Sequence, residues 1–294
     1  MADSAATLSH VLTRLREPIR EALSIAPYAP PDGPVISVKA NLLSLIPPKP
    51  TENIRTEIRD FCLCCAALAS AAAANDTLSW IPGELSESAT VAVSELAEAV
   101  YCASYGDELI GAGNSDSDFS SAPKESRLAA LLMPDVLPLL KGVMKESSIG
   151  SDDDEFSAAS ARAPVAEAVV AAHQLRWFVT QESFNSLGWD GTLLPNVCSL
   201  KVEYPYLGKL CSMVLPCVLT ALDHWSPGVK GQGILSLIHL AKNVNAAELG
   251  FYEEVLLDEC CRNIVSVDEL WHHVVEMSVL LYGIWIQNAM FVLF

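Results

Sequence analysis

The residues best able to do chemistry in this sequence are two adjacent pairs, Cys260-Cys261 and His272-His273. Thiolates and imidazoles are the ligands that zinc prefers, and two of each would complete a tetrahedral site. Structural zinc, however, takes ligands spaced C-x-x-C and H-x-x-x-H, and adjacent residues on a helix point about 100° apart. We therefore interpret the cysteines as small core residues and the histidines as helix-surface residues, and we expect no metal.

Other candidate sites are equally weak. The segment "GVKGQG" (228–233) follows no strand, although phosphate-binding loops need a strand-turn-helix setting. We expect Gly231 and Gly233 instead to let two helices approach closely. A Cys–His nucleophile pair assembled by the fold stays an alternative, but no local catalytic signature is present. His173 lies beside Gln174 on an apolar helix and is interpreted as a satisfied, partly buried side chain, so we expect no enzyme activity and no cofactor.

Charge excludes some classes of partner. The 294 residues carry a net charge of −18, and residues 1–60 hold seven basic and seven acidic side chains, so the rest of the chain supplies all of it. Such a surface repels phosphate backbones and anionic lipids, and we expect neither nucleic-acid nor membrane binding. The odd number of nine cysteines, several of them adjacent and apolar in setting, is typical of a reduced intracellular protein.

The sequence predicts a helical protein, because apolar residues recur at helical spacing and strand signals are scarce. Any binding site must therefore be built on helices. After Pro50, Thr51 is a plausible N-cap for the next helix. The predicted helices cover about 8–19, 54–68, 91–101, 128–143, 165–179, 206–222, 228–243, 246–263 and 267–283. Short helices in pairs favour an all-α fold, an α-solenoid of HEAT/armadillo-type repeats.

One repeat unit is readable in "LPCVLTALDHWSPGVKGQGILSLIHL" (215–240). Pro216 is expected to bend the first helix, and Asp223 to end it and accept backbone N–H groups. Pro227 suits the first turn of the second helix, since its missing N–H costs nothing there. A second Leu-Pro at 137–138 lies 78 residues earlier, close to two repeats of about 40 residues.

Three regions follow from this pattern. Residues 1–124 are helical and weakly repeat-like with proline loops, 125–281 hold the HEAT-like repeats with an acidic loop at 147–160, and 282–294 form an atypical apolar tail. The uncharged run 277–294 is long enough to span a bilayer, so a membrane tail anchor is one alternative. Because Gln287 and Asn288 interrupt it, we expect instead a C-terminally shortened solenoid with one uncovered apolar helix face.

Two residues are candidate partner contacts. Trp225 falls in the turn between the paired helices, where core burial is difficult, and exposed tryptophans are frequent anchors of protein interfaces. Lys230 opens the second helix, where its charge opposes the helix dipole. We expect the side chain of Lys230 to reach Asp223 or Glu254. Lys230 would then have a structural role in addition to its candidate role as a partner contact.

The segment from Leu215 to Ile264 resembles the Tel-two-interacting protein two family, whose members are subunits of the Triple T (TTT) co-chaperone complex. The matching elements are Leu215-Pro216, Leu222-Asp223, Val229-Lys230, Gly233, Leu237, His239-Leu240 and "AAELGFYEEVLLDEC" (246–260). The resemblance is best over 206–281, weaker over 125–205 and faint before that.

The resemblance implies a non-enzymatic scaffold that binds the other two Triple T subunits. Together they would support folding and assembly of phosphatidylinositol-3-kinase-related kinases with the ninety-kilodalton heat-shock chaperone, in the cytoplasm and also in the nucleus. A HEAT-type adaptor for other cargo, such as a transport or phosphatase scaffold, is the alternative. The family offers no catalytic residue to carry over.

Overall fold

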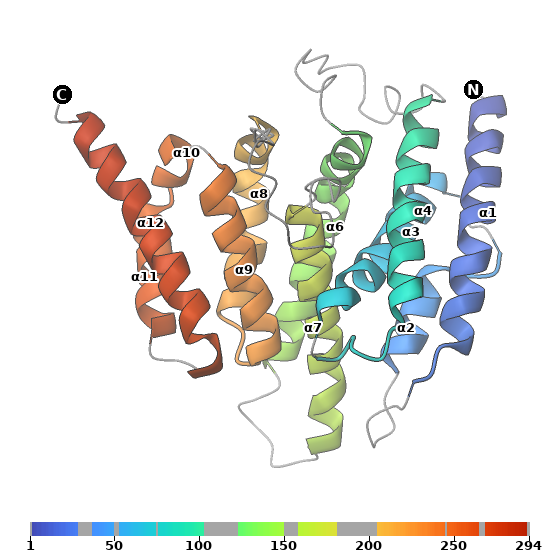
Figure 1. Cartoon of the computed structure of the whole chain (residues 1–294), viewed down its shortest axis with the longest axis horizontal. Helices are drawn as coiled ribbons and strands as arrows, with labels where there is room; N and C mark the ends of the chain where they lie inside the picture. The colour runs from blue at the N-terminus through green and yellow to red at the C-terminus, as the bar shows by residue number, and fades with distance from the viewer. Residues whose placement is uncertain are drawn as a thin grey trace, which may run out of the picture.

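The chain folds as a row of helices that pack on one another in sequence (Figure 1). The computed structural model describes residues 2–28, 37–49, 53–74, 76–102, 123–149, 158–180, 205–244, 246–264 and 268–292. Within these ranges every regular element is a helix and no strand is present. The predicted all-α fold class is therefore confirmed. Residues 150–157 of the predicted acidic loop (147–160) lie outside the described residues.

The helices of the described ranges differ in length. They are α1 (Ala2–Ile25), α2 (Val38–Leu45), α3 (Ile54–Ser70), α4 (Gly83–Cys102), α6 (Lys124–Ile149), α7 (Ala158–Val179), α8 (Pro205–Leu222), α9 (Pro227–Asn243), α10 (Ala246–Gly250), α11 (Glu253–Ile264) and α12 (Trp271–Val292). The described residues also contain two 3-10 turns, Ala71–Ala73 and Asp268–Leu270.

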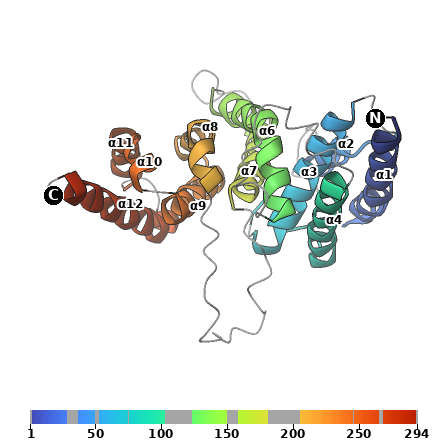
Figure 2. The same ribbon diagram turned by 90° about the horizontal axis from the view of Figure 1, so that it is seen from above.

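The packing partners define a solenoid in two layers. In one layer α1 packs on α4, α4 on α6, α6 on α8, and α8 on α10 and α11. In the other, α2 packs on α3, α3 on α7, α7 on α9, and α9 on α12. Each helix therefore contacts its pair partner and its nearest neighbours in the stack, and the two termini lie at opposite ends (Figures 1 and 2). A stack of this kind buries one continuous core along its length.

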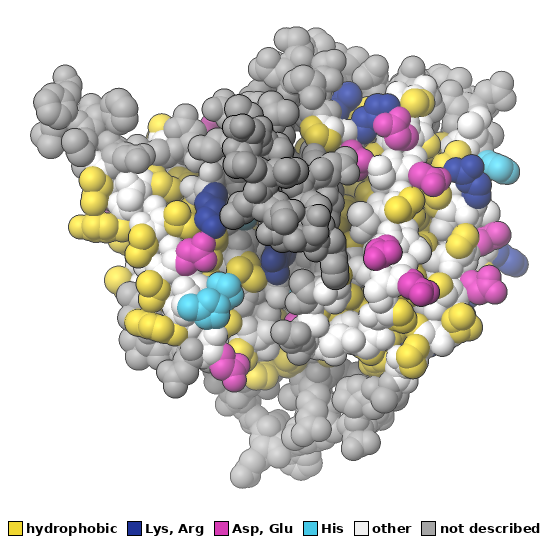
Figure 3. All heavy atoms as spheres, in the orientation of Figure 1, with side chains coloured by type: hydrophobic (Ala, Val, Ile, Leu, Met, Phe, Trp, Pro, Cys, Tyr) yellow, Lys and Arg dark blue, Asp and Glu magenta, His cyan; other side chains and the backbone are white. Residues whose placement is uncertain are grey.

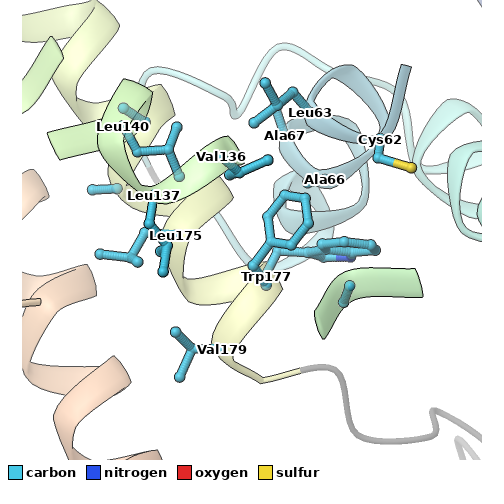
Figure 4. Packing of buried hydrophobic residues seen from close by; sticks show 14 of the residues in the cluster. Cys62, Leu63, Ala66, Ala67, Val136, Leu137, Leu140, Leu175, Trp177 and Val179 are labelled. Carbon is cyan, nitrogen blue, oxygen red and sulfur yellow. The ribbon is translucent and has the colours of Figure 1, made fainter. Parts of the chain in front are cut away.

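The middle of the core joins α3, α6 and α7 (Figure 4). Small residues of α3 face larger residues of the other two helices, which lets the three backbones pack closely. The labelled side chains are Cys62, Leu63, Ala66 and Ala67 of α3, Val136, Leu137 and Leu140 of α6, and Leu175, Trp177 and Val179 of α7. Trp177 also meets Phe178 edge to face, with ring centroids 5.1 Å apart.

Helix boundaries follow local chemistry, with one correction to the predicted caps. Asn53, and not Thr51, caps α3: its side chain accepts hydrogen bonds from the backbone N–H groups of Arg55 and Thr56. Pro227 occupies the first turn of α9 as predicted. α6 tolerates two prolines, Pro134 and Pro138, within one helix.

The C-terminal third departs from the predicted elements in two places. The helix expected over 246–263 is divided at Gly250 into α10 and α11. The last helix does not stop near 283 but continues as α12 to Val292. None of the helices in the described part of the chain has the length and apolarity needed to cross a membrane.

Gly233 explains how tightly α8 and α9 pack, as predicted from the glycine spacing. A Cβ atom at this position would lie 3.0 Å from both the Cβ of Ala221 and the backbone nitrogen of Leu222. Contacts to backbone leave no room for relief, so we expect Gly233→Ala to destabilise the protein by about 1–3 kcal/mol. Gly142 in α6 has open space around its Cβ position, and Gly142→Ala should instead stabilise by about 1 kcal/mol. Urea-unfolding midpoints of the two variants should therefore move in opposite directions, and a shared direction would contradict this account.

Candidate protein-binding surface

The turn between α8 and α9 presents one exposed aromatic side chain. Trp225 is 52% exposed, although its Nε1–H donates a long hydrogen bond of 3.4 Å to the backbone oxygen of Ser147 at the end of α6. Its ring stacks on that of His224, with centroids 5.7 Å apart. Trp225 is thus held in a fixed orientation at the edge of the stack, which is the arrangement expected of a protein-binding anchor.

Beneath Trp225 lies a buried polar network that centres on His224. Nδ1 of His224 accepts the backbone N–H of Ser226 at 3.0 Å, and Nε2 lies 2.7 Å from the Oγ of Ser147. Because the Ser147 hydroxyl donates to the carbonyl of Met144, it accepts from Nε2–H, so the imidazole is neutral. Burial, with the nearby charge of Lys230, lowers the pKa of His224 below its ordinary value. The network joins α6 to the α8–α9 turn.

The prediction that Asp223 accepts backbone N–H groups of the turn is wrong. Nδ1 of His224 accepts the N–H of Ser226, and Asp223 instead pairs with Arg262 of α11. Arg262 donates to the carboxylates of Asp223 at 2.9 Å, Asp258 at 2.9 Å and Glu259 at 2.6 Å. Burial, followed by the charge of Asp223, raises the pKa of Glu259, against the opposing charge of Arg262. This cluster joins the α8–α9 turn to α11.

Lys230 is half-buried beside the same cluster. Burial lowers the pKa of Lys230, although the negative charges of Asp223 and then Glu259 act to raise it. The predicted neighbour Asp223 is therefore present, and Glu259 stands in the place expected for Glu254. Lys230 of α9 thus places positive charge beside the carboxylates of Asp223 and Glu259, while Trp225 in the preceding turn is exposed.

The residues considered for metal or nucleophilic chemistry are dispersed. Cys260 is buried and Cys261 exposed, so the two sulfurs point apart as their spacing predicts. Burial raises the pKa of Cys62 and of Cys64 to about 12, which leaves both thiols protonated and unreactive. Among the residues that the structure describes, no group of three or more His, Cys, Asp and Glu side chains is placed to hold a metal ion.

His173 is buried, and its Nε2 lies 2.7 Å from Oδ2 of Asp76 in the segment before α4. Burial acts to raise the pKa of Asp76, but the hydrogen bond and charge of His173 outweigh it and leave that pKa below its ordinary value. The neighbouring Gln174 donates to the carbonyl of Leu63 at 2.9 Å. The pair therefore joins α7 to α3 and to the segment before α4, and it fits the interpretation of His173 as a satisfied side chain.

A second exposed surface, which the sequence did not resolve residue by residue, runs along α12. Five apolar side chains are each between 40% and 66% exposed, and they recur at intervals of 4, 4, 3 and 4 residues: Trp271, Val275, Val279, Tyr282 and Ile286. We call this set the α12 stripe. Figure 3 shows hydrophobic side chains gathered on the left-hand part of the molecule, where α12 lies. Exposed apolar patches of this extent mark interaction sites.

The two surfaces share an edge of the stack. α9 and α12 are neighbours in one layer and both begin at the lower end in Figure 1, so the α8–α9 turn and the start of α12 lie on the same side. An aromatic residue stands at each place, Trp225 in the turn and Trp271 at the first position of α12. Both tryptophans are about half exposed, with exposed fractions of 52% and 49%.

Comparison with known proteins gives one relative and no described family. No family model matches the chain, and no solved structure shows a significant match. The chain is 42% identical over 294 residues to the Arabidopsis thaliana protein with the name Uncharacterized protein At2g39910. The match covers 96% of this chain and 59% of that relative, so the chain spans about three fifths of the curated relative's length.

Proposed function

We propose that this chain is a non-enzymatic HEAT-type scaffold and a subunit of the Triple T co-chaperone complex. In that role it would bind the other two subunits and support phosphatidylinositol-3-kinase-related kinases together with the ninety-kilodalton heat-shock chaperone, in the cytoplasm and the nucleus. The resemblance over 206–281 is one support. The observation that carries the proposal is that this stretch exposes Trp225 and the first three residues of the α12 stripe, Trp271, Val275 and Val279, on a stack of helices.

Affinity purification tests the proposal directly. The tagged chain should recover both other Triple T subunits from cells of its source organism. Recovery of neither subunit would contradict the proposal, and recovery of transport or phosphatase components in their place would favour the alternative adaptor.

Trp225 supplies a sharper prediction within the same experiment. Trp225→Ala should weaken recovery by about 30-fold, because truncating an aromatic anchor costs about 2 kcal/mol of binding free energy. Ile25→Ala is the matched control: Ile25 is 79% exposed at the end of α1, far from the edge that carries Trp225. Both variants should retain the wild-type melting temperature within a few degrees. Equal recovery by the two variants would remove Trp225 from the interface.

A further inference from the structure

A groove of about 440 Å³ lies between α1 and α4, at the opposite end of the stack from the α12 stripe. Leu15, Pro18 and Ile19 of α1 form one side of its apolar floor, and Val91 and Ala92 of α4 form the other. Val91 is 57% exposed although it is a large aliphatic side chain. The groove is therefore a surface on which a partner can bury apolar area.

The rim of the groove is acidic. Glu84, Glu87 and Glu95 of α4 line it with a single cation, Arg14 of α1, which leaves a net charge of −2. Arg14 is engaged by Glu95, with Nη2 and Oε2 3.0 Å apart. Within the described part of the chain, no cation lies at ion-pair distance from Glu84 or Glu87. Figure 3 shows acidic side chains spread over the right-hand part of this face, with hydrophobic ones between them.

The spacing of these residues sets the shape of a ligand. Glu84, Glu87, Val91 and Glu95 follow one another at intervals of 3, 4 and 4 residues, so they lie on one face of α4. The eleven helical steps from Glu84 to Glu95 extend over about 17 Å, or three turns. A helix of the same length laid along the groove would place apolar residues at i, i+4 and i+7 on the floor, with side chains at the flanks facing the carboxylates.

We propose that the α1–α4 groove binds a short basic amphipathic helix of another protein, whose apolar face fills the floor and whose Lys or Arg side chains pair with Glu84 and Glu87. The acidic rim selects against nucleic acid and anionic lipid, since both would bring negative charge to negative charge. The groove uses none of the residues assigned to the Triple T contact, so either proposal can fail alone.

The test begins with a display library of 15-residue helical peptides selected on the purified whole chain. The enriched sequences should combine an apolar stripe at i, i+4 and i+7 with flanking Lys or Arg, and the binding of the best peptide should weaken as ionic strength rises. Failure to enrich any peptide, or enrichment of acidic or uncharged ones, would overturn the proposal.

Groove variants then locate the bound peptide by fluorescence anisotropy. Val91→Asp and the double variant Glu84→Lys/Glu87→Lys should each weaken binding at least tenfold. Val255→Asp is the matched control, because Val255 is 47% exposed on α11 at the far end of the stack, and it should leave binding unchanged. A peptide with its Lys residues replaced by Glu should bind the Glu84→Lys/Glu87→Lys chain better than the wild type. Loss of binding in Val255→Asp, or none in Val91→Asp, would refute the assignment.

Discussion

Replacing His224 by alanine should lower the free energy of unfolding by about 3 kcal/mol, one of the largest effects expected of any single polar substitution in this chain. The side chain is only 1% exposed and satisfies both the N–H of Ser226 and the hydroxyl of Ser147. Its removal leaves a buried donor without an acceptor and opens a cavity between α6 and the α8–α9 turn. Urea unfolding followed by tryptophan fluorescence should show the loss, and Trp225 should become more mobile.

The same histidine makes stability depend on pH. Its folded-state pKa lies below the unfolded value of about 6.5, so the unfolded chain binds more protons as the pH falls through and below that value. Protonation would also turn Nδ1 into a donor that faces the Ser226 N–H and add positive charge beside Lys230. The contribution is therefore complete above about pH 6.5 and declines toward pH 5.

Melting curves of the wild type and of His224→Ala between pH 7.5 and pH 5 separate this contribution from the rest. The difference in stability between the two chains should shrink as the pH falls. His272→Ala is the control, because His272 is exposed at the start of α12 and has no comparable buried partners. A constant difference across the pH range, or an equal loss in His272→Ala, would show that the network does not act as described.

Local signals predicted the α8–α9 unit well, because each of them acts within a few residues. Pro227 fixes the start of α9, and the apolar spacing from Val229 to Ala241 fixes its buried face. The break after α10 escaped prediction for the same reason. Leu249 and Leu256 are both fully buried and lie two helical turns apart, so a continuous helix would satisfy the same spacing. α10 and α11 both pack on α8 and on α12, and these tertiary contacts leave no trace in the local spacing of apolar residues.

The polar network around His224 could not be predicted, because its partner Ser147 lies 77 residues away. Their meeting depends on α6 stacking against α8, and no periodicity in either segment encodes that contact. The groove between α1 and α4 is similar: the acidic spacing from Glu84 to Glu95 is readable in the sequence, but its apolar floor needs α1 beside α4.

α12 shows a different limit of sequence reasoning. The helix is apolar on two sides, with Val274, Met277, Leu281 and Trp285 buried against the stack and the α12 stripe facing outward. Both sets have helical spacing, so the sequence predicts an uncovered apolar face without revealing which residues compose it. The structure shows which of the two sets is buried and which is exposed, and so it identifies the residues to mutate.

Because the α12 stripe is apolar and exposed, we expect the isolated chain to self-associate through it. Placing two carboxylates on the stripe should abolish both this self-association and the binding of the proposed partners. The double variant Val279→Glu/Tyr282→Glu puts charge at the centre of the stripe, where the side chains are 66% and 63% exposed. A buried unpaired charge at an interface costs several kcal/mol, so recovery of the other Triple T subunits should fall by at least about a hundredfold. The variant should still fold, because the opposite face of α12 keeps its contacts with α9.

Light scattering of the isolated chain and affinity purification from cells measure the two effects separately. Ile25→Glu/Leu139→Glu is the matched control, since it adds the same charge at two exposed apolar positions on α1 and α6, away from α12. Association is expected to persist in the control and to disappear in the α12 variant. If the α12 variant lost association but recovered both subunits normally, the stripe would not be their binding surface, and the Trp225 edge alone would have to account for the interaction. If the α12 variant both self-associated and recovered the two subunits normally, the exposed face of α12 would have no part in either process.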